Sequence, residues 1–409
     1  MIIRSSFDCE TCGQNHVVRI GMGHDDRQVH RFPCRACGEE MVIALNVSYE
    51  DLTAHAEAVE NARAANEGPK ALFVNVHANF ILKETEKFKD STFPHMQQMA
   101  ENFSAAERYG SIRPVSADDL KGKGARPFRR PDFSDEWKLL KKAWSLHSRG
   151  RDKLSQREIL EASSKYYLDD PLAHLSDWIW RFSMFLGATK YEILLRDIMN
   201  EVVPIIRNGQ AEGLIAEYKK GVAVRSRRYF DILRDYFSAW EEFSQVHFSV
   251  SRGLPVSPGH SVASSGFRSV KMFYGNAFEV FSSLIDILAF FNNLIEGRDW
   301  KKFELIDDAA YLRLDKAKRF DALMTRSAFM NLCEEKDNQL RNASHHDALE
   351  FVAEAGRIRY RLGKGNLGEA REISYTDYLT QCSKIFFQIV TLLRTDLLIC
   401  NHYKIPFPK

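Results

Sequence analysis

A short polar run in the C-terminal third of the chain carries the residue types needed to cleave a phosphodiester without a metal. Residues 340–346 read Leu-Arg-Asn-Ala-Ser-His-His, so Arg341 and Asn342 precede two histidines. Histidine titrates near neutral pH and can act as an acid or a base. Arginine stays charged, and its planar guanidinium matches two phosphate oxygens. Asn342 could orient the phosphate or a histidine. Together these groups could support attack of a ribose 2′-hydroxyl on the adjacent phosphate of RNA.

The spacing of this run resembles a family signature. Arg341, Asn342 and His346 stand as Arg-Asn-x-x-x-His, which resembles the motif of the HEPN superfamily, helical proteins of which many are metal-independent ribonucleases. The resemblance covers roughly residues 267–409 and implies a helical bundle that cleaves RNA with no catalytic metal. It also implies a homodimer through this region, because two motifs meet in one composite site in such nucleases. By the same resemblance, the protein would be a regulated endoribonuclease, either an antiphage (abortive infection) effector of bacteria or a toxin.

The family pattern and helix geometry favour different histidines. On an ideal helix, at about 100° per residue, His345 lies on the same face as Arg341, whereas His346 lies about 140° away. From the family pattern we predict that His346 transfers the proton, with His345 as an alternative or auxiliary residue. Asp337 lies one turn before Arg341 and is expected to hold its guanidinium.

A second interpretation of the same run involves no catalysis. The motif could lie on a solvated helix face with Arg341 paired to Asp337, and some HEPN domains keep only the fold. The protein would then be a zinc-ribbon scaffold that dimerises and binds RNA or protein. Substitution of Arg341 or His346 separates the two interpretations, since a scaffold keeps its activity after either change.

Four of the seven cysteines form two Cys-x-x-Cys pairs in the first 37 residues. They are Cys9, Cys12, Cys34 and Cys37. Each pair is followed by glycine and flanked by a short β-rich run, a pattern that predicts a zinc ribbon. Four thiolates leave no open position on Zn²⁺ for catalysis, so the metal is expected to be structural. With four cysteines available, the nearby His16, His24 and His30 are expected at the surface.

Hydrophobic patterning predicts a mainly α-helical chain in three parts. Residues 1–49 form the zinc ribbon, which is the small β part. Residues 50–250 form a mainly helical middle or regulatory region, which could sense a phage or host trigger together with the ribbon. A Gly-, Pro- and Arg-rich linker lies near 117–133, and a Ser-, Gly- and Pro-rich stretch at 249–266 marks a second boundary. Residues 267–409 form the HEPN-like helical bundle.

Several local elements are predicted within these parts. Residues 50–66 look helical, and an apolar stripe at three- and four-residue steps predicts helix over 273–295. A small hairpin is expected from 357–362 and 372–375 around a Gly-rich loop, followed by a last helix over roughly 376–402.

The densest basic stretch on a predicted helix has two interpretations. It contains Lys219, Lys220, Arg225, Arg227 and Arg228. Such a cluster is either a solvated face or a patch that binds nucleic-acid phosphates.

Composition excludes several classes of protein. The 409 residues include 57 Lys plus Arg and 55 Asp plus Glu, a net charge of +2, which excludes a broadly polycationic nucleic-acid coat. Hydrophobic residues make up 44% of the chain, as in a soluble globular protein. The most apolar stretches, 277–295 and 385–400, are interrupted by charged and amide residues, so a cytoplasmic location without a membrane segment is expected. There is no P-loop, Gly-x-Ser-x-Gly, His-Glu-x-x-His or dinucleotide motif.

Overall fold

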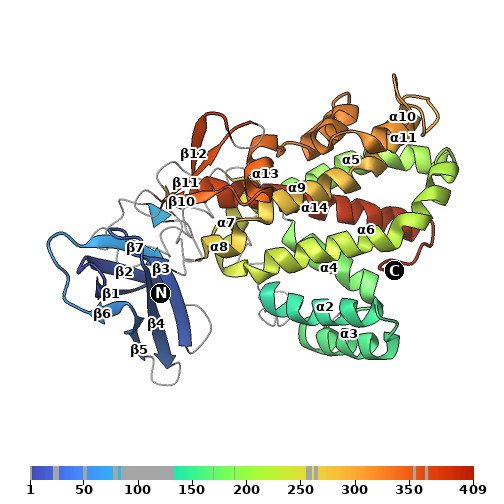
Figure 1. Ribbon diagram of the computed structural model, residues 1–409. Helices are drawn as coiled ribbons and strands as arrows, with labels where there is room; N and C mark the ends of the chain where they lie inside the picture. The colour runs from blue at the N-terminus through green and yellow to red at the C-terminus, as the bar shows by residue number, and fades with distance from the viewer. Residues whose placement is uncertain are drawn as a thin grey trace, which may run out of the picture.

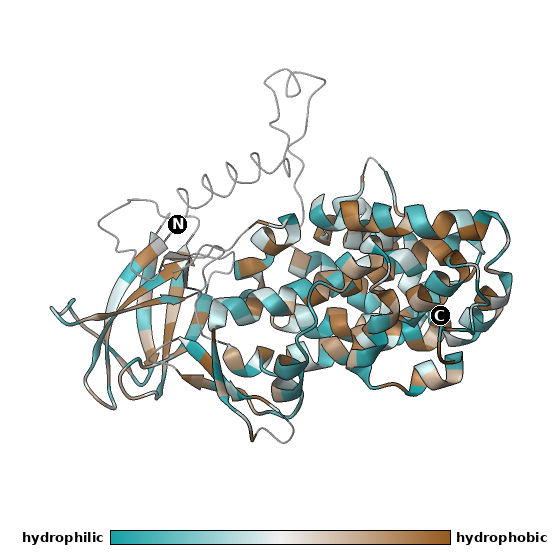
Figure 2. Cartoon of the chain, turned by 90° about the horizontal axis from the view of Figure 1, so that it is seen from above, coloured by the Kyte–Doolittle hydropathy of each residue, from teal (hydrophilic) through white to brown (hydrophobic). Residues whose placement is uncertain are grey.

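The computed structural model has a β region at one end and a long helical body at the other, and both views show this arrangement (Figures 1 and 2). The predicted fold class, mainly α-helical with a small N-terminal β region, is confirmed at this level. The described residues are 2–21, 27–48, 53–76, 82–83, 133–168, 170–187, 189–254, 260–261, 266–352, 356–363 and 367–409. The expected linker near 117–133 lies outside them, apart from its last residue.

Two small sheets make up the β region and share one apolar core. One has the strand order β6 (Ala62–Ala64), β1 (Ile2–Cys9), β2 (Asn15–Gly21) and β7 (Leu72–Val76). The other has the order β3 (Arg27–Pro33), β4 (Glu40–Ser48) and β5 (Thr53–Glu60). Buried side chains from both sheets, such as Phe7 and Ile43, form this core. Burial alternates along β3, as the two-residue period of a strand requires.

The prediction of helix over 50–66 is wrong, because this segment contains β5 and β6. Alanine and glutamate favour a helix, but pairing with β4 overrides that local preference. Ala56 lies opposite Leu45 in the register, and Ala58 lies opposite Ile43. Alanine recurs at every second residue from Ala54 to Ala58, which is the period of a strand. The β region therefore continues through β7, past residue 49.

The helical body is built around one long helix, α14 (Tyr375–His402), which is buried on nearly all sides. It contacts α4, α5, α6, α7 and α9 and runs through the centre of the body in Figure 1. The helices that precede residue 260 are α2 (Phe133–His147), α3 (Asp152–Tyr166), α4 (Leu175–Leu186), α5 (Thr189–Arg207), α6 (Glu212–Ser238) and α7 (Trp240–Arg252). Those that follow it are α8 (Phe267–Val270), α9 (Phe273–Leu284), α10 (Asp286–Ile295), α11 (Asp308–Arg313), the 3-10 helix η1 (Lys316–Leu323), α12 (Ser327–Leu332) and α13 (Asn338–His345).

Short strands complete the body. The predicted hairpin is confirmed as β11 (Arg357–Arg361) and β12 (Ala370–Ser374), which pair antiparallel, and β10 (Glu350–Val352) adds a third strand. The predicted last helix is confirmed as α14. Two further strands, β8 (Leu82–Lys83) and β9 (His260–Ser261), pair with each other.

One hydrophobic core extends from Trp137 to Phe407 and includes residues on both sides of the expected boundary at 249–266. The stretch Phe267–Ile295 is long and apolar enough to cross a membrane, yet 67% of its most apolar window is buried inside the protein. Such burial is typical of a core helix. The described helices before and after the boundary therefore pack as one body.

A buried ion pair ties the two sides of this body together. Arg225 of α6 donates from Nε to Asp396 of α14 at 2.9 Å and from Nη1 to Asp286 of α10 at 2.7 Å. Its Nη2 donates to the carbonyl of Leu284 at 2.7 Å, and the hydroxyl of Tyr229 donates to Asp396 at 2.9 Å. Because Asp396 is fully buried, its charge depends on these donors.

Arg225→Met is expected to lower the free energy of unfolding by about 3–5 kcal/mol, because it leaves two carboxylates without their buried counter-charge. Chemical denaturation of the two proteins measures the difference. Lys220→Met on the same helix is the matched control, since Lys220 is exposed and pairs with Glu217 at 2.6 Å. A loss below about 1 kcal/mol for Arg225→Met would contradict the assigned role.

Candidate functional site

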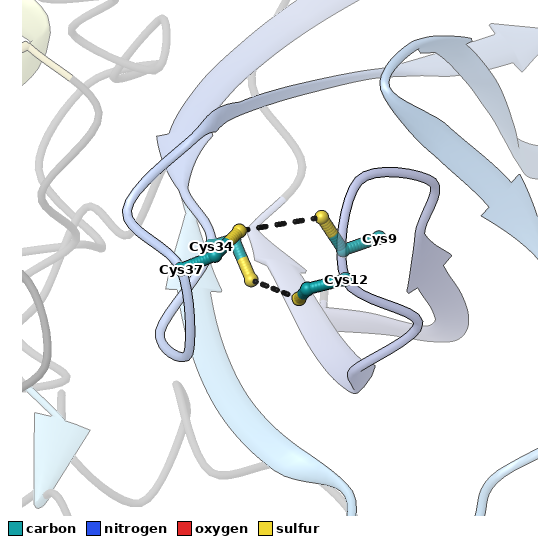
Figure 3. A group of neighbouring side chains, drawn as sticks. All are labelled: Cys9, Cys12, Cys34 and Cys37. Atoms are coloured by element: carbon teal, nitrogen blue, oxygen red, sulfur yellow. Dashed lines mark hydrogen bonds between the residues drawn. The ribbon is translucent and has the colours of Figure 1, made fainter.

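The four N-terminal cysteines come together at the point where the two sheets meet. Their Sγ atoms all lie within 4.8 Å of one another and point toward a common centre (Figure 3). The Sγ atoms of Cys9 and Cys37 are 3.8 Å apart, and those of Cys12 and Cys34 are 3.6 Å apart. A zinc ion with bonds of about 2.3 Å to four sulfurs places those sulfurs about 3.8 Å apart. The predicted cluster is therefore assembled, and its geometry fits a metal ion such as Zn²⁺.

Glycines shape both cysteine turns. Gly13 has a φ of 75° and Gly38 a φ of 79°, a region that residues with a Cβ rarely adopt. The amide of Gly13 donates to the carbonyl of Cys9 at 2.8 Å, and the amide of Gly38 donates to that of Cys34 at 2.9 Å. The two turns thus have the same conformation.

Asn61, in the turn between β5 and β6, links the two cysteine turns. Its Oδ1 accepts from the amide of Thr11 at 3.0 Å and from the hydroxyl of Thr11 at 2.8 Å. Its Nδ2 donates to the carbonyl of Glu40 at 2.9 Å. Sequence reasoning missed this residue because it assigned the segment to a helix. Hydrogen bonds of this kind orient the ligands of a metal and tune its affinity.

The expectation that the neighbouring histidines are at the surface is wrong for His16 and His30, which are buried, while His24 lies outside the described residues. Burial lowers the pKa of His16, so its ring is neutral. Nε2 of His16 accepts from the amide of Arg35 at 3.2 Å, and Nδ1 donates to the carbonyl of Gln14 at 3.0 Å. His16 therefore fastens the second cysteine turn to the first sheet rather than binding the metal.

The polar run of the C-terminal third lies on α13, a helix of eight residues. Asp337 caps it, with Oδ1 accepting from the amides of Gln339 at 2.8 Å and Leu340 at 3.0 Å. The buried side chains of Leu340 and Ala343 pack into the core. The charged and polar residues of the motif therefore lie toward the outside of the helix.

A close crossing fixes α13 against α9. The amide of Gly275 donates to Oγ of Ser344 at 3.0 Å, and this hydroxyl donates to the carbonyl of Lys271 at 2.8 Å. A Cβ at Gly275 would lie 2.7 Å from the amide nitrogen of His345, so the crossing requires glycine. The position of His345 along α9 is set by this contact.

Arg341 is held by Glu279 of α9 rather than by the Asp337 side chain. Its Nε donates to Oε1 of Glu279 at 2.7 Å, and its Nη2 donates to the same oxygen. Its Nη1 donates to Oδ1 of Asn342 at 2.7 Å. The carboxylate of Asp337 caps the helix and lies 3.6 Å from Arg371. Sequence reasoning missed Glu279, although an acid that interrupts an apolar stripe is a usable signal.

Both candidate histidines are exposed at the end of α13. Their ring centroids are 5.6 Å apart with an interplanar angle of 71°. Neither ring has a hydrogen bond to any part of the chain that the structure describes. His346 is the C-cap, with a φ of −96° and a ψ of 17°, so it lies just beyond the helix. Ideal helix periodicity therefore does not set its direction, and the choice between the two histidines stays a prediction.

A buried carboxyl group supports the start of α13. The hydroxyl of Tyr274 donates to Oε1 of Glu335 at 2.7 Å and accepts from the amide of Asp337 at 2.8 Å. Burial raises the pKa of Glu335 to about 7, although the hydrogen bond from Tyr274 opposes the change. Glu335 therefore ionises near neutral pH beside the helix that carries Arg341. It belongs to no motif, and no sequence signal pointed to it.

The five basic residues predicted on α6 differ in burial and in their partners. Arg225 is buried and ion-paired in the core, as described above. Lys220 pairs with Glu217, and Arg227 pairs with Asp231 at 3.0 Å, both on the exposed side, where Lys219 also lies. Arg228 is half-buried. The five cations therefore do not share one surface.

Cavities of about 870 and 260 Å³ open elsewhere in the described part of the chain, near residues 404–409. The larger is lined by parts of α4, the end of α14 and residues 404–408, and the smaller by parts of α2 and α6 and by Lys409. Neither is lined by described residues of α13.

Comparisons with models of protein families, with characterised proteins and with solved structures find no match. A function must therefore be argued from the chemistry of these two sites.

Purified protein is expected to contain one zinc ion per chain, and Cys34→Ser is expected to lose it, because a tetrahedral site needs all four thiolates. Asn61→Ala should retain the site but lower the metal affinity about 10- to 100-fold, since it removes support around the ligands. Elemental analysis and a chelator competition measure both quantities. Cys333→Ser is the control, because Cys333 is a buried thiol of the helical core outside the cluster. Full zinc content in Cys34→Ser would contradict the assignment.

The contribution of Glu335 to the stability of the helical body is expected to fall as the pH rises from about 4.5 to about 7. In this window the folded chain keeps a proton on Glu335 that the unfolded chain has lost, so rising pH favours unfolding. Glu335→Gln removes this dependence. The free energy of unfolding of the variant minus that of the wild type should therefore rise with pH and level off above pH 7, after a total rise on the order of 3 kcal/mol. Denaturant unfolding across this range tests it.

The matched control is Glu334→Gln, since Glu334 is exposed and pairs with Lys190 at 2.7 Å. A difference between Glu335→Gln and the wild type that stays constant from pH 5 to pH 8 would show that Glu335 does not titrate in this window.

Proposed function

We propose that the protein is a metal-independent endoribonuclease of the HEPN type, with a zinc ribbon of structural role. The observation that carries the proposal is the grouping of a charged guanidinium, an amide and two exposed imidazoles within six residues at one end of α13. Exposed histidines beside a positioned arginine are the groups that phosphodiester cleavage by a 2′-hydroxyl requires. The resemblance of Arg341, Asn342 and His346 to the HEPN motif supports the same reaction.

The reaction follows from the roles of these groups. A base takes the proton of the ribose 2′-hydroxyl, and O2′ attacks the adjacent phosphorus. The bond from phosphorus to O5′ then breaks, and an acid gives a proton to O5′. The products are a 2′,3′-cyclic phosphate and a 5′-hydroxyl. His346 supplies one proton transfer, with His345 as the alternative or auxiliary residue, and Arg341 stabilises the charge on the phosphorane.

The ion pair with Glu279 has a defined part in this proposal. It holds the Arg341 side chain in one orientation, so this side chain loses little conformational entropy when it binds the phosphate. The Nη1 bond to Asn342 uses the amide oxygen, and among the described residues the amide NH₂ has no acceptor, so it can donate to the substrate. Arg341 and Asn342 thus present donors on the same side of α13.

A second copy of the chain completes the site. One chain offers a single pair of adjacent histidines, whereas in-line displacement needs an acid and a base on opposite sides of phosphorus. The exposed end of α13 is open to a second protomer, and a two-fold dimer through 267–409 would bring two motifs together. The protein acts on RNA in the cytoplasm, where reduced thiols can bind zinc. By the same resemblance it serves in antiphage defence or as a toxin, with the N-terminal region sensing the trigger.

Purified wild-type protein is expected to cleave labelled single-stranded RNA in the presence of EDTA and to leave cyclic-phosphate ends. His346→Ala should lower the rate by a factor on the order of 10²–10⁴, because it removes a proton-transfer group. His345→Ala should have a smaller effect. The control is His402→Ala, since His402 is also exposed but lies at the end of α14. Zinc content is measured in each sample, so that loss of the ribbon is not mistaken for loss of catalysis.

The non-catalytic scaffold is the other outcome of this experiment. Equal cleavage by wild type and by a variant that carries both His345→Ala and His346→Ala would reject the nuclease. Intact RNA with dimeric, zinc-loaded wild-type protein would also reject it, if expression of the wild type causes no growth arrest and His346→Ala behaves identically under phage challenge.

A further inference from the structure

Three residues of α9 lie at four-residue steps along one face and contact three groups of the site. They are Gly275, Glu279 and Ser283, separated by about 6 Å per step along the helix axis. Gly275 packs against the backbone of His345, and Glu279 binds Arg341. Nζ of Lys316, in η1, donates to Oγ of Ser283 at 2.6 Å. The end of α13, Arg341 and Lys316 therefore form a row along α9.

A further cation lies near the Lys316 end of this row. Helix α9 contacts α6, which carries Arg228, and η1, which carries Lys316, and Arg228 is close enough for its charge to act on Lys316. Burial lowers the pKa of half-buried Lys316, and the charges of Arg319 and Arg228 lower it further. The carboxylates of Glu279 and Asp286 act on Lys316 in the opposite sense. Lys316 is thus close enough to Arg319 and Arg228 for their like charges to repel it, which costs electrostatic energy.

The acids nearby have other partners. Glu279 accepts two hydrogen bonds from Arg341, and Asp286 is bound by Arg225. Arg319 is buried and donates to the carbonyl of Leu312. Among the described residues Arg228 has no hydrogen bond or ion pair of its own. The cations at this end therefore exceed the carboxylates available to neutralise them, which is the condition that an anionic ligand satisfies.

We propose that Lys316 and Arg228 bind a backbone phosphate of single-stranded RNA next to the phosphate held by Arg341. The inference rests on the proposed function, to which it adds a substrate subsite and a direction along α9. Glu279 and Ser283, which hold Arg341 and Lys316, lie one turn apart, about 6 Å along the axis of α9. Cations held along one helix in this way suit successive phosphates of one extended strand, without contact to base edges. Binding at this subsite is therefore independent of base sequence and sensitive to salt.

The subsite is tested by RNA binding in a protein that cannot cleave. His346→Ala is the background, and the probe is a fluorescein-labelled oligouridine followed by anisotropy. Adding Lys316→Gln or Arg228→Gln is expected to weaken binding about three- to tenfold. Each should also reduce the slope of log K against log salt by about 0.7, the value for one phosphate contact on a single strand. Lys220→Gln should change neither quantity, because Lys220 lies about 12 Å along α6 from Arg228 and pairs with Glu217.

A second pair of measurements separates a lost contact from a folding defect. Lys316→Arg keeps the charge and should bind RNA like the background, and thermal unfolding should show that Lys316→Gln stays folded. Unchanged affinity and slope in folded Lys316→Gln and Arg228→Gln, or no RNA binding by the background protein, would overturn the subsite.

Failure of the subsite and failure of the nuclease give different results. If His346→Ala abolishes cleavage while Lys316→Gln and Arg228→Gln bind RNA normally, the nuclease stands and the subsite is wrong. If wild type cleaves nothing while both substitutions weaken binding as described, the subsite stands as an RNA-binding surface and the catalytic proposal is wrong.

Discussion

The candidate site depends on the close crossing of α9 and α13 at Gly275. Because residue 275 has no side chain, the backbone of His345 lies directly on α9, and the two hydrogen bonds of Ser344 fix the register. One turn further along α9, this register places Glu279 opposite Arg341. A helix of eight residues has little stability of its own. Its position, and hence that of every polar group on it, comes from this contact and from the cap at its other end.

In the helical body, helices of the middle region and of the C-terminal region pack around one core and do not form two independent units. Arg225 joins α6 to α10 and α14 through its ion pairs with Asp286 and Asp396. Helices α4 to α7 also supply apolar side chains to the same core as α9 and α14. A change of conformation in the middle region therefore reaches α9 through direct packing, without a hinge between two independent units.

Features encoded by residues close in sequence could be predicted. The cysteine spacing indicated the metal cluster, because two short turns bring four thiolates together whatever the rest of the fold. The hairpin of β11 and β12 and the helix α14 followed from local periodicity and turn residues. The catalytic roles of Arg341 and His346 came from resemblance and stay predictions.

Features that depend on distant pairing could not be predicted. Strand β5 has the composition of a helix and becomes a strand through pairing with β4. Glu279 meets Arg341 across 62 residues, and Asn61 reaches Thr11 across 50. His16 looked like a surface residue because its burial depends on the second sheet. In each case the deciding contact is made by the tertiary structure, between residues far apart in the sequence, and the local sequence does not name the partner.

The central position of α14 has a consequence for the order of events during synthesis. Chains emerge from the ribosome from the N-terminus, and domains generally fold as units once their residues are available. The β region and its four cysteines are complete long before residue 375. The helices α4 to α9, by contrast, lack the element around which they pack until α14 has been made. Tyr378 of α14 also binds the carbonyl of Lys271, beside Ser344. The part of the core that supports α13 is therefore among the last to form. A chain still bound to the ribosome has no assembled site until α14 has been synthesised.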